Sequence, residues 1–301
     1  MANLLDEASI LLTPTAYNNG SMLAIKPENG DGDFTFSRNS AATRVNAQGL
    51  VENVQILSSN LVSNGDFSQE GSQLITNGDF ATDSDWVKGT GWTISGGTAN
   101  CDGTNFATIS QSKILVVGKT YKYSFTISNL TQGGVRLFLG NTVGSTNSAN
   151  GTFTGYITYS SGSSIFLQAR DSFIGSITNI SVKEVGQDWT LGTGWSIGEN
   201  KALYNGVSEP YLYSLSPVNI AVSDKLKITF VLDSNAKLRF VNENGSRFSG
   251  TWVLYASGTH EVYLTSSIVA TQIGVQADTD NGAFGITNIS VIEITDDTNL
   301  P

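Results

Sequence analysis

The sequence has one cysteine, Cys101, and one histidine, His260, in 301 residues. A lone cysteine forms no intramolecular disulfide, so crosslinks do not hold the fold. A histidine-based catalytic triad would have to use His260. Because Phe153 stands at the matching place of the internal repeat described below, we expect His260 to be a surface or sheet-edge residue and predict no catalytic role for it.

Charge and long apolar runs are also scarce. Charged residues are 14% of the chain, the net charge is −10, and the Lys and Arg residues are scattered singly. Binding of phosphate backbones needs basic clusters, so nucleic acid is excluded as a partner. No segment approaches the ~20 apolar residues that span a bilayer, which predicts no membrane insertion. Residues 1–7 lack the basic and apolar regions of a secretory signal peptide.

Proline is rare, with 5 residues, and no stretch shows sustained helical apolar periodicity. Glycine is abundant, with 32 residues, and Ser, Thr and Asn are frequent. These residues supply the positive φ values and local hydrogen bonds that tight turns between short strands require. The composition therefore predicts an all-β protein.

The chain repeats itself. Residues 85–92 read DWVKGTGW and residues 188–195 read DWTLGTGW, identical at six of eight positions. Gln168-Ala169 matches Gln276-Ala277, and the closing segments 177–185 and 286–294 share ITNISV. A period near one hundred residues exceeds a solenoid unit of ~20–50 residues and fits tandem domains. We predict an N-terminal docking arm or small β segment at 1–60, repeat 1 at 61–185 and repeat 2 at 186–301.

Alternation of apolar and polar residues marks the strands within each repeat. Tyr121, Tyr123, Phe125 and Ile127 alternate with polar residues, and so do Leu226, Ile228 and Phe230, which predicts sheets with one buried face. About eight such strands in each repeat indicate a β-sandwich of the jelly-roll type. The linker 186–187 is short, so the modules should be closely coupled.

The N-terminal segment differs from the repeats. Residues 9–13 and 21–25 read as short strands around the turn residues 18–20, but large apolar residues are too few for an independent core. We expect an extended arm that packs on a repeat, on another subunit or on a larger assembly. A short repeat follows, because the tetrapeptide NGDF occurs at both 64–67 and 77–80. Its Asn-Gly pair indicates a turn, and the Phe can cover the edge of a sheet.

Two parts of the sequence carry a family resemblance. NGDF, GTGWTISGG (89–97) and GSITNISVKEV (175–185) resemble the carbohydrate-binding-module-like jelly rolls of phage structural proteins and bacterial polysaccharide enzymes. FTFSRNSAATRVNAQGLVE (34–52) resembles the N-terminal segment of phage tail and fibre proteins. The resemblance implies a virion protein whose arm docks to other virion proteins, with Phe34, Phe36, Arg38 and Arg44 as the docking residues.

The family often has Asp, a usual partner of a structural calcium ion, where this chain has Thr178 and Thr287. This departure disfavours calcium, so no cofactor is expected. The oxygen-rich loops 29–33 and 278–282 offer weak metal candidates, Asp31, Asp33, Asp278 and Asp280, but neither continues to a glutamate at EF-hand spacing. Asp, Asn and Gly also make turns, and that interpretation is preferred.

Aromatic residues are the candidates for sugar binding. Trp86, Trp92, Trp189 and Trp195 recur in both repeats, which favours packing in the core or at sheet edges. Repeat 2 has an enlarged segment between Phe240 and Gly258 that holds a candidate glycan-binding patch of four residues: Arg247, Phe248, Trp252 and Tyr255. The alternative is that Trp252 to Tyr255 form a longer strand that fills the core or contacts another subunit.

The leading hypothesis is a non-enzymatic phage tail-fibre, tail-tip or head-decoration protein. It would be made in the host cytoplasm, lie on the virion exterior and adhere to cell-surface polysaccharide, as a homo-oligomer that analogy suggests is a trimer. No pair of carboxylates is singled out as a glycosidase would require. The alternatives are a purely structural capsid or tail decoration protein that binds no glycan, and the glycan-binding part of a polysaccharide-degrading enzyme.

Overall fold

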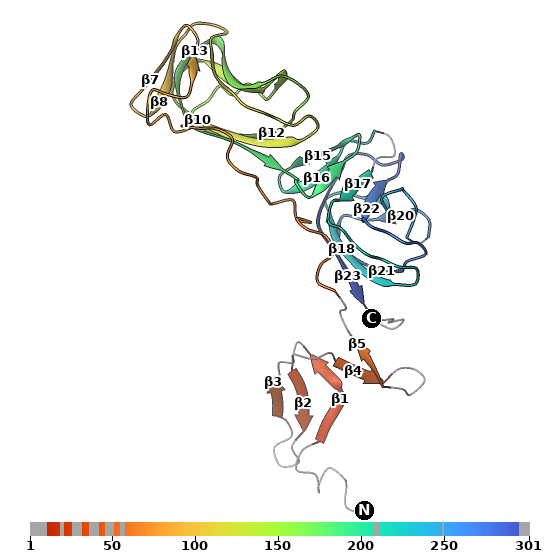
Figure 1. Ribbon diagram of the computed structural model, residues 1–301. Coiled ribbons are helices and arrows are strands. Elements are labelled where there is room, and N and C mark those ends of the chain that lie inside the picture. Colours follow the sequence, from red (N-terminus) through yellow and green to blue (C-terminus); the bar gives the residue numbers. More distant parts are fainter. Residues whose placement is uncertain are drawn as a thin grey trace, which may run out of the picture. The chain divides into compact units, whose positions relative to one another are not determined.

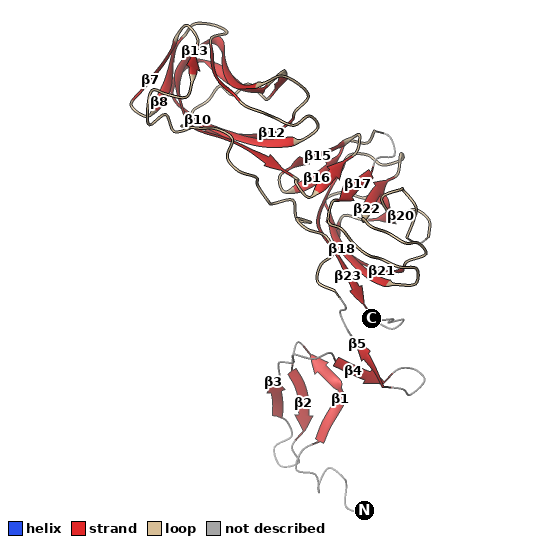
Figure 2. Ribbon diagram, viewed as in Figure 1, coloured by secondary structure: helices blue, strands red, loops and turns tan. Residues whose placement is uncertain are grey.

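A computed structural model of the chain describes residues 58–207, 211–248 and 250–294 with their side chains, and the backbone of five earlier strands. Every regular element in these residues is a β-strand (Figure 2), which confirms the all-β prediction. Across the described residues we find no helix of the length and apolarity needed to cross a bilayer. The chain divides into two compact units, Met1–Ile56 and Leu57–Pro301.

The first unit contains two small antiparallel sheets (Figure 1). One is formed by β1 (Leu11–Asn18), β2 (Ser21–Ile25) and β3 (Gly32–Thr35), and the other by β4 (Ala42–Val45) and β5 (Val51–Val54). The predicted strand at 21–25 coincides with β2. Of the proposed docking residues, Phe34 lies on β3 and Arg44 on β4, while their side chains, and all of Phe36 and Arg38, lie outside the described residues.

Repeat 1 is a sandwich whose two layers are joined by two long strands. β10 (Thr120–Leu139) and β13 (Ser164–Val185) pair along most of their length and pass through both layers. The layer around the first half of β10 is extended by β12 (Gly151–Thr158), and the layer around its second half by β11 (Thr142–Val143). The other strands of this module are β6 (Val87–Lys88), β7 (Trp92–Ser95), β8 (Thr98–Asp102) and β9 (Thr108–Ser112).

Repeat 2 has the same architecture with the long strands broken, so its two layers are separate five-stranded sheets. One sheet has the order β14 (Trp189–Leu191), β17 (Tyr211–Ser214), β22 (Gly274–Ala277), β19 (Ala236–Val241) and β20 (Val253–Tyr255). The other has the order β15 (Trp195–Gly198), β16 (Lys201–Tyr204), β23 (Phe284–Ile294), β18 (Lys225–Leu232) and β21 (Gly258–Thr265). β18 and β19 correspond to the two halves of β10.

The alternation seen in the sequence places the cores as predicted. Tyr121, Tyr123, Phe125 and Ile127 on β10 are buried, and so are Leu226, Ile228 and Phe230 on β18. Each module has its own cluster of buried apolar residues. The four recurrent tryptophans are also buried, which confirms that they pack in the cores: Trp86, Trp92, Trp189 and Trp195.

The two NGDF turns serve different sandwiches. Asn77 to Phe80 close repeat 1: the Phe80 ring lies 5.1 Å from that of Trp86, and the Ile180 amide donates to the Gly78 carbonyl oxygen. Asn64 to Phe67 instead pack on repeat 2, where the Phe67 ring lies 5.1 Å from that of Trp189.

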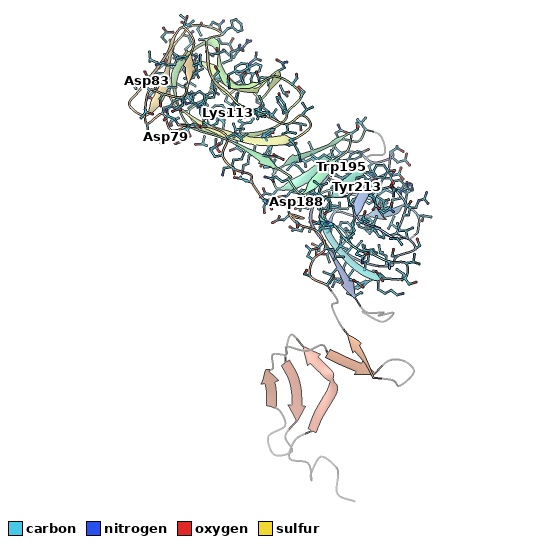
Figure 3. All side chains as sticks on the ribbon, viewed as in Figure 1. Asp79, Asp83, Lys113, Asp188, Trp195 and Tyr213 are labelled. Atoms are coloured by element: carbon cyan, nitrogen blue, oxygen red, sulfur yellow. The ribbon has the colours of Figure 1, made fainter. Side chains whose placement is uncertain are left out.

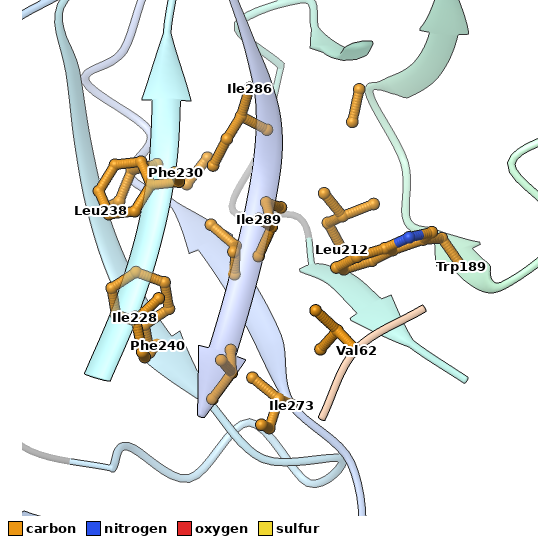
Figure 4. Close-up of a cluster of buried hydrophobic side chains, with 14 of the residues drawn as sticks. Val62, Trp189, Leu212, Ile228, Phe230, Leu238, Phe240, Ile273, Ile286 and Ile289 are labelled. Carbon is orange, nitrogen blue, oxygen red and sulfur yellow. The ribbon is translucent and has the colours of Figure 1, made fainter. Parts of the chain in front are cut away.

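The segment before Phe67 packs on repeat 2 as well. The Leu61 amide donates to the Val291 carbonyl oxygen, and Figure 4 shows Val62 in the repeat 2 core beside Trp189. Residues 61–67, which the repeat boundary assigned to repeat 1, therefore belong by contact to the second sandwich. Repeat 1 is inserted between this segment and the rest of repeat 2.

The two modules touch at the short linker. Tyr156 of β12 packs against the core cluster of repeat 2, and Val185 at the end of β13 belongs to that cluster. Gly186 follows with φ of +74°, and a Cβ there would lie 2.7 Å from Ile197 Cγ1. The structure thus shows the close coupling that the two-residue linker predicted.

Candidate functional site

An aromatic platform lies on the outer face of the β14–β20 sheet of repeat 2. Tyr211 and Tyr213 alternate on β17 with the buried Leu212, so both rings point away from the core. The rings stack with centroids 5.2 Å apart and planes 12° apart. Figure 3 marks Tyr213 on this sandwich. Its ring lies against β22 because the neighbouring residue is Gly274, where a Cβ would come within 2.4 Å of Tyr213 Cδ1.

Polar and aromatic groups from three other segments continue this platform. Arg239 on β19 faces Gln276 on β22, and Arg239 Nε donates to Gln276 Oε1 at 2.5 Å. The Arg239 guanidinium also covers the ring of Trp252, with Cζ 4.0 Å from the ring centroid. Gln276 is aligned with Tyr211 across β17 and β22. We call Tyr211, Tyr213, Arg239 and Trp252, with Gln276 beneath them, the tyrosine face. Gln276 is itself fully buried, so it positions Arg239 and is not open to a ligand.

The ionisation states of two groups beside this face follow from their surroundings. Burial, with smaller contributions from Tyr211 and Glu243, raises the pKa of Tyr213 to about 12, so its hydroxyl stays protonated at neutral pH. Burial acts to raise the pKa of Glu243, but hydrogen bonds with backbone N–H groups leave it below its usual range. Those donors include the amides of Thr271 at 3.0 Å and Gln272 at 3.1 Å. Glu243 is therefore an ionised carboxylate that accepts hydrogen bonds from the backbone.

The structure brings one of the four predicted glycan-binding residues onto the tyrosine face, namely Trp252. Phe248 is fully buried and belongs to the repeat 2 core, so its ring is not available to a ligand. Tyr255 turns toward the core margin, with its ring 5.1 Å from that of Phe230. Arg247 is exposed and makes an isolated bridge with Val241.

The alternative interpretation of this segment as a core-filling strand holds only for Tyr255, which packs against the repeat 2 core, and an intersubunit contact stays a prediction. β20 has only three residues, and two of them, Val253 and Leu254, are 45% and 70% exposed. The outward alternation of Tyr211 and Tyr213 could have identified the platform from the sequence. The meeting of Arg239, Gln276 and Trp252 could not, because they come from segments far apart in the chain.

The predicted metal loops are built as turns where the structure describes them. Asp278 Oδ1 accepts the Asp280 amide at 3.2 Å, and Lys237 Nζ lies 2.7 Å from Asp278 Oδ2. The hydrogen bond from Lys237 is the main cause of a lowered Asp278 pKa. The side chains of Asp31 and Asp33 lie outside the described residues. Elsewhere, no three His, Cys, Asp or Glu side chains gather into a group that could hold a metal ion, among the residues that the structure describes.

Thr178 and Thr287, which stand where the resemblance implies a calcium-binding Asp, fill equivalent positions in the two modules. Thr178 Oγ1 lies 3.1 Å from the Gly97 carbonyl oxygen and 3.4 Å from that of Asp79. Thr287 Oγ1 lies 2.8 Å from the Asn200 carbonyl oxygen and 3.3 Å from that of Asp66. In each module the hydroxyl donates to backbone oxygens of the kind that bind Ca²⁺.

His260 lies on β21, the edge strand of its sheet, as expected. Its Nε2 is 2.7 Å from the carbonyl oxygen of Ala256, and its ring packs 5.2 Å from that of Phe230. These contacts anchor the imidazole at the margin of the sandwich, on the sheet opposite the tyrosine face.

Comparisons with solved structures find two tandem carbohydrate-binding-module proteins and an allantoicase. The tandem CBM22 modules of Paenibacillus barcinonensis Xyn10C match with 11% identity and a TM-score of 0.31, covering 75% of this chain and 99% of that one. Tandem CBM51 modules of a family 98 glycoside hydrolase from Streptococcus pneumoniae match with 6% identity and a TM-score of 0.25, covering 75% and 97%. Allantoicase from Saccharomyces cerevisiae matches with 9% identity and a TM-score of 0.29, covering 79% and 95%. No protein-family model and no curated protein matches the sequence.

Proposed function

We propose that this chain is a non-enzymatic glycan-binding protein that holds a neutral polysaccharide on the tyrosine face. The observation that carries the proposal is the convergence of the stacked Tyr211 and Tyr213 with the Arg239–Gln276 pair and Trp252 on one outer sheet face. Sugar rings present apolar C–H faces that pack on aromatic rings. Their hydroxyl groups can accept hydrogen bonds from a guanidinium group, here Arg239, and can pair with tyrosine hydroxyls.

The rigidity of this face supports binding of an extended ligand. Tyr213 is held against Gly274, and the guanidinium of Arg239 is fixed between Gln276 and Trp252. A pre-positioned side chain loses little conformational entropy when a ligand binds. The glycan would therefore meet a platform that is largely formed before it arrives.

The chemistry of Glu243 supports binding without catalysis. A glycosidase needs a general acid whose pKa is raised and a second carboxylate across the bond that is cleaved. The pKa of Glu243 is lowered instead, and backbone amides occupy its oxygen Oε2. We therefore assign Glu243 to fixing the 242–246 turn beside the platform.

We further propose that the protein is part of a phage virion, where residues 1–60 dock to other virion proteins and the two sandwiches project outward. This part rests on the resemblance of residues 34–52 to phage tail and fibre proteins. A homotrimer would multiply weak contacts, because linked sites raise avidity without new contacts. Immunogold imaging of particles with an antibody to residues 186–301 tests it. Label on fibres or the tail tip supports the role, and absence from particles refutes it.

A glycan array tests the binding function. We expect the wild-type chain, presented as an oligomer, to bind neutral glycans, and Trp252→Ala to weaken binding about tenfold through loss of ring contact. Val222→Ala is the matched control, because this 56% exposed side chain lies just before β18, a strand of the other sheet, and outside the tyrosine face. Failure of every oligomeric form to bind any glycan would refute the adhesion function and leave a structural decoration protein.

A further inference from the structure

Repeat 1 carries its own version of the Arg–Gln pair on the corresponding sheet face. Arg136 on β10 faces Gln168 on β13, and Arg136 Nη2 donates to Gln168 Oε1 at 3.0 Å. Gln168 and Gln276 occupy the same place in the two repeats. The residues between the outward-facing ones, including Val135, Leu137, Leu167 and Ala169, are fully or almost fully buried. This face is therefore the outer side of a well-packed sheet.

The aromatic groups around this pair differ from those of repeat 2. Phe138 and Phe166 stack with centroids 4.4 Å apart and planes 8° apart, and the Arg136 guanidinium covers the Phe138 ring. Arg170 covers Phe106, with Cζ 4.5 Å from the ring centroid, and the Phe106 ring is 54% exposed. We call Phe106, Arg136, Phe138, Phe166, Gln168 and Arg170 the arginine face.

The two arginines occupy neighbouring positions in the strand ladder of this face. Arg136 pairs with Gln168 and Gly134 pairs with Arg170, so Arg136 and Arg170 are diagonal partners in the ladder. Diagonal partners in an antiparallel ladder lie roughly 7–8 Å apart. A Cβ at Gly134 would lie 2.7 Å from the Asn147 carbonyl oxygen, so residues 146–148 cover the ladder at this position. Arg136 and Arg170 are also the only arginines of repeat 1.

Neither guanidinium is neutralised. Among the described residues, no carboxylate forms an ion pair with Arg136 or Arg170, and Arg136 Nε has no hydrogen-bond partner. Repeat 2 differs at the corresponding place, where Asp278 replaces Arg170 and binds Lys237. A local charge of two arginines without a counterion is therefore specific to repeat 1 of a chain whose net charge is −10.

We propose that the arginine face is a second glycan site, one that binds the carboxylate or sulfate group of an acidic sugar. A guanidinium presents a planar fork of N–H donors that matches such oxygens. In Arg136, Nη2 already donates to Gln168 and Nε is buried, so Arg170 is the main donor for the ligand. The stacked Phe138 and Phe166 would support the sugar ring beside the charged group. This inference rests on the proposed glycan-binding function and divides it: acidic sugar on repeat 1, neutral sugar on repeat 2.

Binding of polygalacturonate and of its fully methyl-esterified form, measured by affinity electrophoresis, tests the proposal. The two polymers share a backbone and differ in charge. We expect the wild-type chain to bind the acid more tightly than the ester, and the difference between the two affinities to shrink as salt increases. The same comparison of dextran sulfate with dextran tests whether the site binds sulfate groups. Nonspecific retention of polyanions is disfavoured by the net charge of −10.

Substitutions assign the binding to the arginine face. Arg170→Gln should weaken binding of the acidic polymer about tenfold, because a charge-assisted contact is lost. Arg247→Gln is the matched control, because this exposed arginine lies outside both faces, and it should leave binding of the acidic polymer unchanged. Equal binding of acid and ester, no binding of either acidic polymer, or a normal affinity in Arg170→Gln would overturn the proposal. Neutral-glycan binding that is sensitive to Trp252→Ala, read on the same preparations, shows whether the proposed function stands independently.

Discussion

Trp189 Nε1 donates a hydrogen bond of 2.9 Å to the carbonyl oxygen of Asn64, which lies 125 residues earlier in the chain. Repeat 1 makes the same contact within a short segment, since Trp86 Nε1 donates to the Asn77 carbonyl oxygen at 2.9 Å. The same tetrapeptide therefore closes both sandwiches, once locally and once across an inserted domain. The second sandwich is discontinuous in sequence.

This arrangement predicts that each Phe of the NGDF turns stabilises a different module. Phe67→Ala should destabilise repeat 2 by about 3–5 kcal/mol, since it removes a fully buried ring beside Trp189. Phe80→Ala is the matched variant and should destabilise repeat 1. Hydrogen exchange resolved by peptide should show faster exchange in 186–294 for the first variant and in 85–185 for the second. Faster exchange confined to repeat 1 in Phe67→Ala would contradict the assignment.

Gly274 is predicted to control the position of Tyr213. Because a Cβ at Gly274 would lie 2.4 Å from Tyr213 Cδ1, Gly274→Ala should displace the ring from the sheet and weaken neutral-glycan binding about tenfold. Gly282→Ala is the control, since a Cβ there meets no atom within 4 Å. Isothermal titration with a glycan identified on the array measures the effect. Unchanged affinity in Gly274→Ala, with a normal melting temperature, would remove Tyr213 from the site.

The ion pairs of Glu70 predict a loss of stability in acid. Hydrogen bonds from Lys122 and Lys183, at 2.6 and 2.9 Å, lower the pKa of Glu70. A lowered pKa means that the contribution is complete above the ordinary value of 4.5 and disappears as the pH falls through the folded-state pKa. Because the groups are partly exposed, Glu70→Gln should cost no more than about 1 kcal/mol at pH 7.

The measurement for Glu70 is chemical denaturation of wild type and Glu70→Gln between pH 7 and pH 2.5. The difference between the two free energies of unfolding should shrink as the pH falls below 4.5. Glu199→Gln removes the same charge from an exposed position and serves as the control. A difference that stays constant with pH would show that the ion pairs do not set the pKa of Glu70.

The surroundings of Thr287 predict that an Asp at this position would create a calcium site. An Asp at this position would place a carboxylate beside the Asn200 and Asp66 carbonyl oxygens, which Thr287 now contacts through its hydroxyl. Thr287→Asp should lower the melting temperature in chelator, because like partial charges repel, and Ca²⁺ should raise it again. The wild type should melt at the same temperature with and without Ca²⁺. Thr287→Asn, which lacks the charge, should show little calcium dependence, and an equal calcium response in both variants would contradict this explanation.

The sequence alone determined the fold class, the duplication and the buried faces of the strands. Alternation is a local property, because successive side chains of a strand point to opposite sides, so Tyr121 to Ile127 and Leu226 to Phe230 could be assigned without long-range information. The recurrence of DWxxGTGW likewise identified the two modules from the sequence alone, because a repeated motif can be recognised without long-range information.

Only the tertiary structure decided which segments meet. Asn64 and Asn77 begin identical turns, and nothing local tells which sandwich each one closes. From the sequence, Phe248 and Trp252 were both candidates for contact with a sugar. In the structure Phe248 is buried in the core, and Trp252 packs against the guanidinium of Arg239. The two candidate faces are each assembled from several strands, so they depend on register and on the path of the chain between layers. Such contacts are set by the packing of the whole sandwich, which the local pattern of residues does not specify.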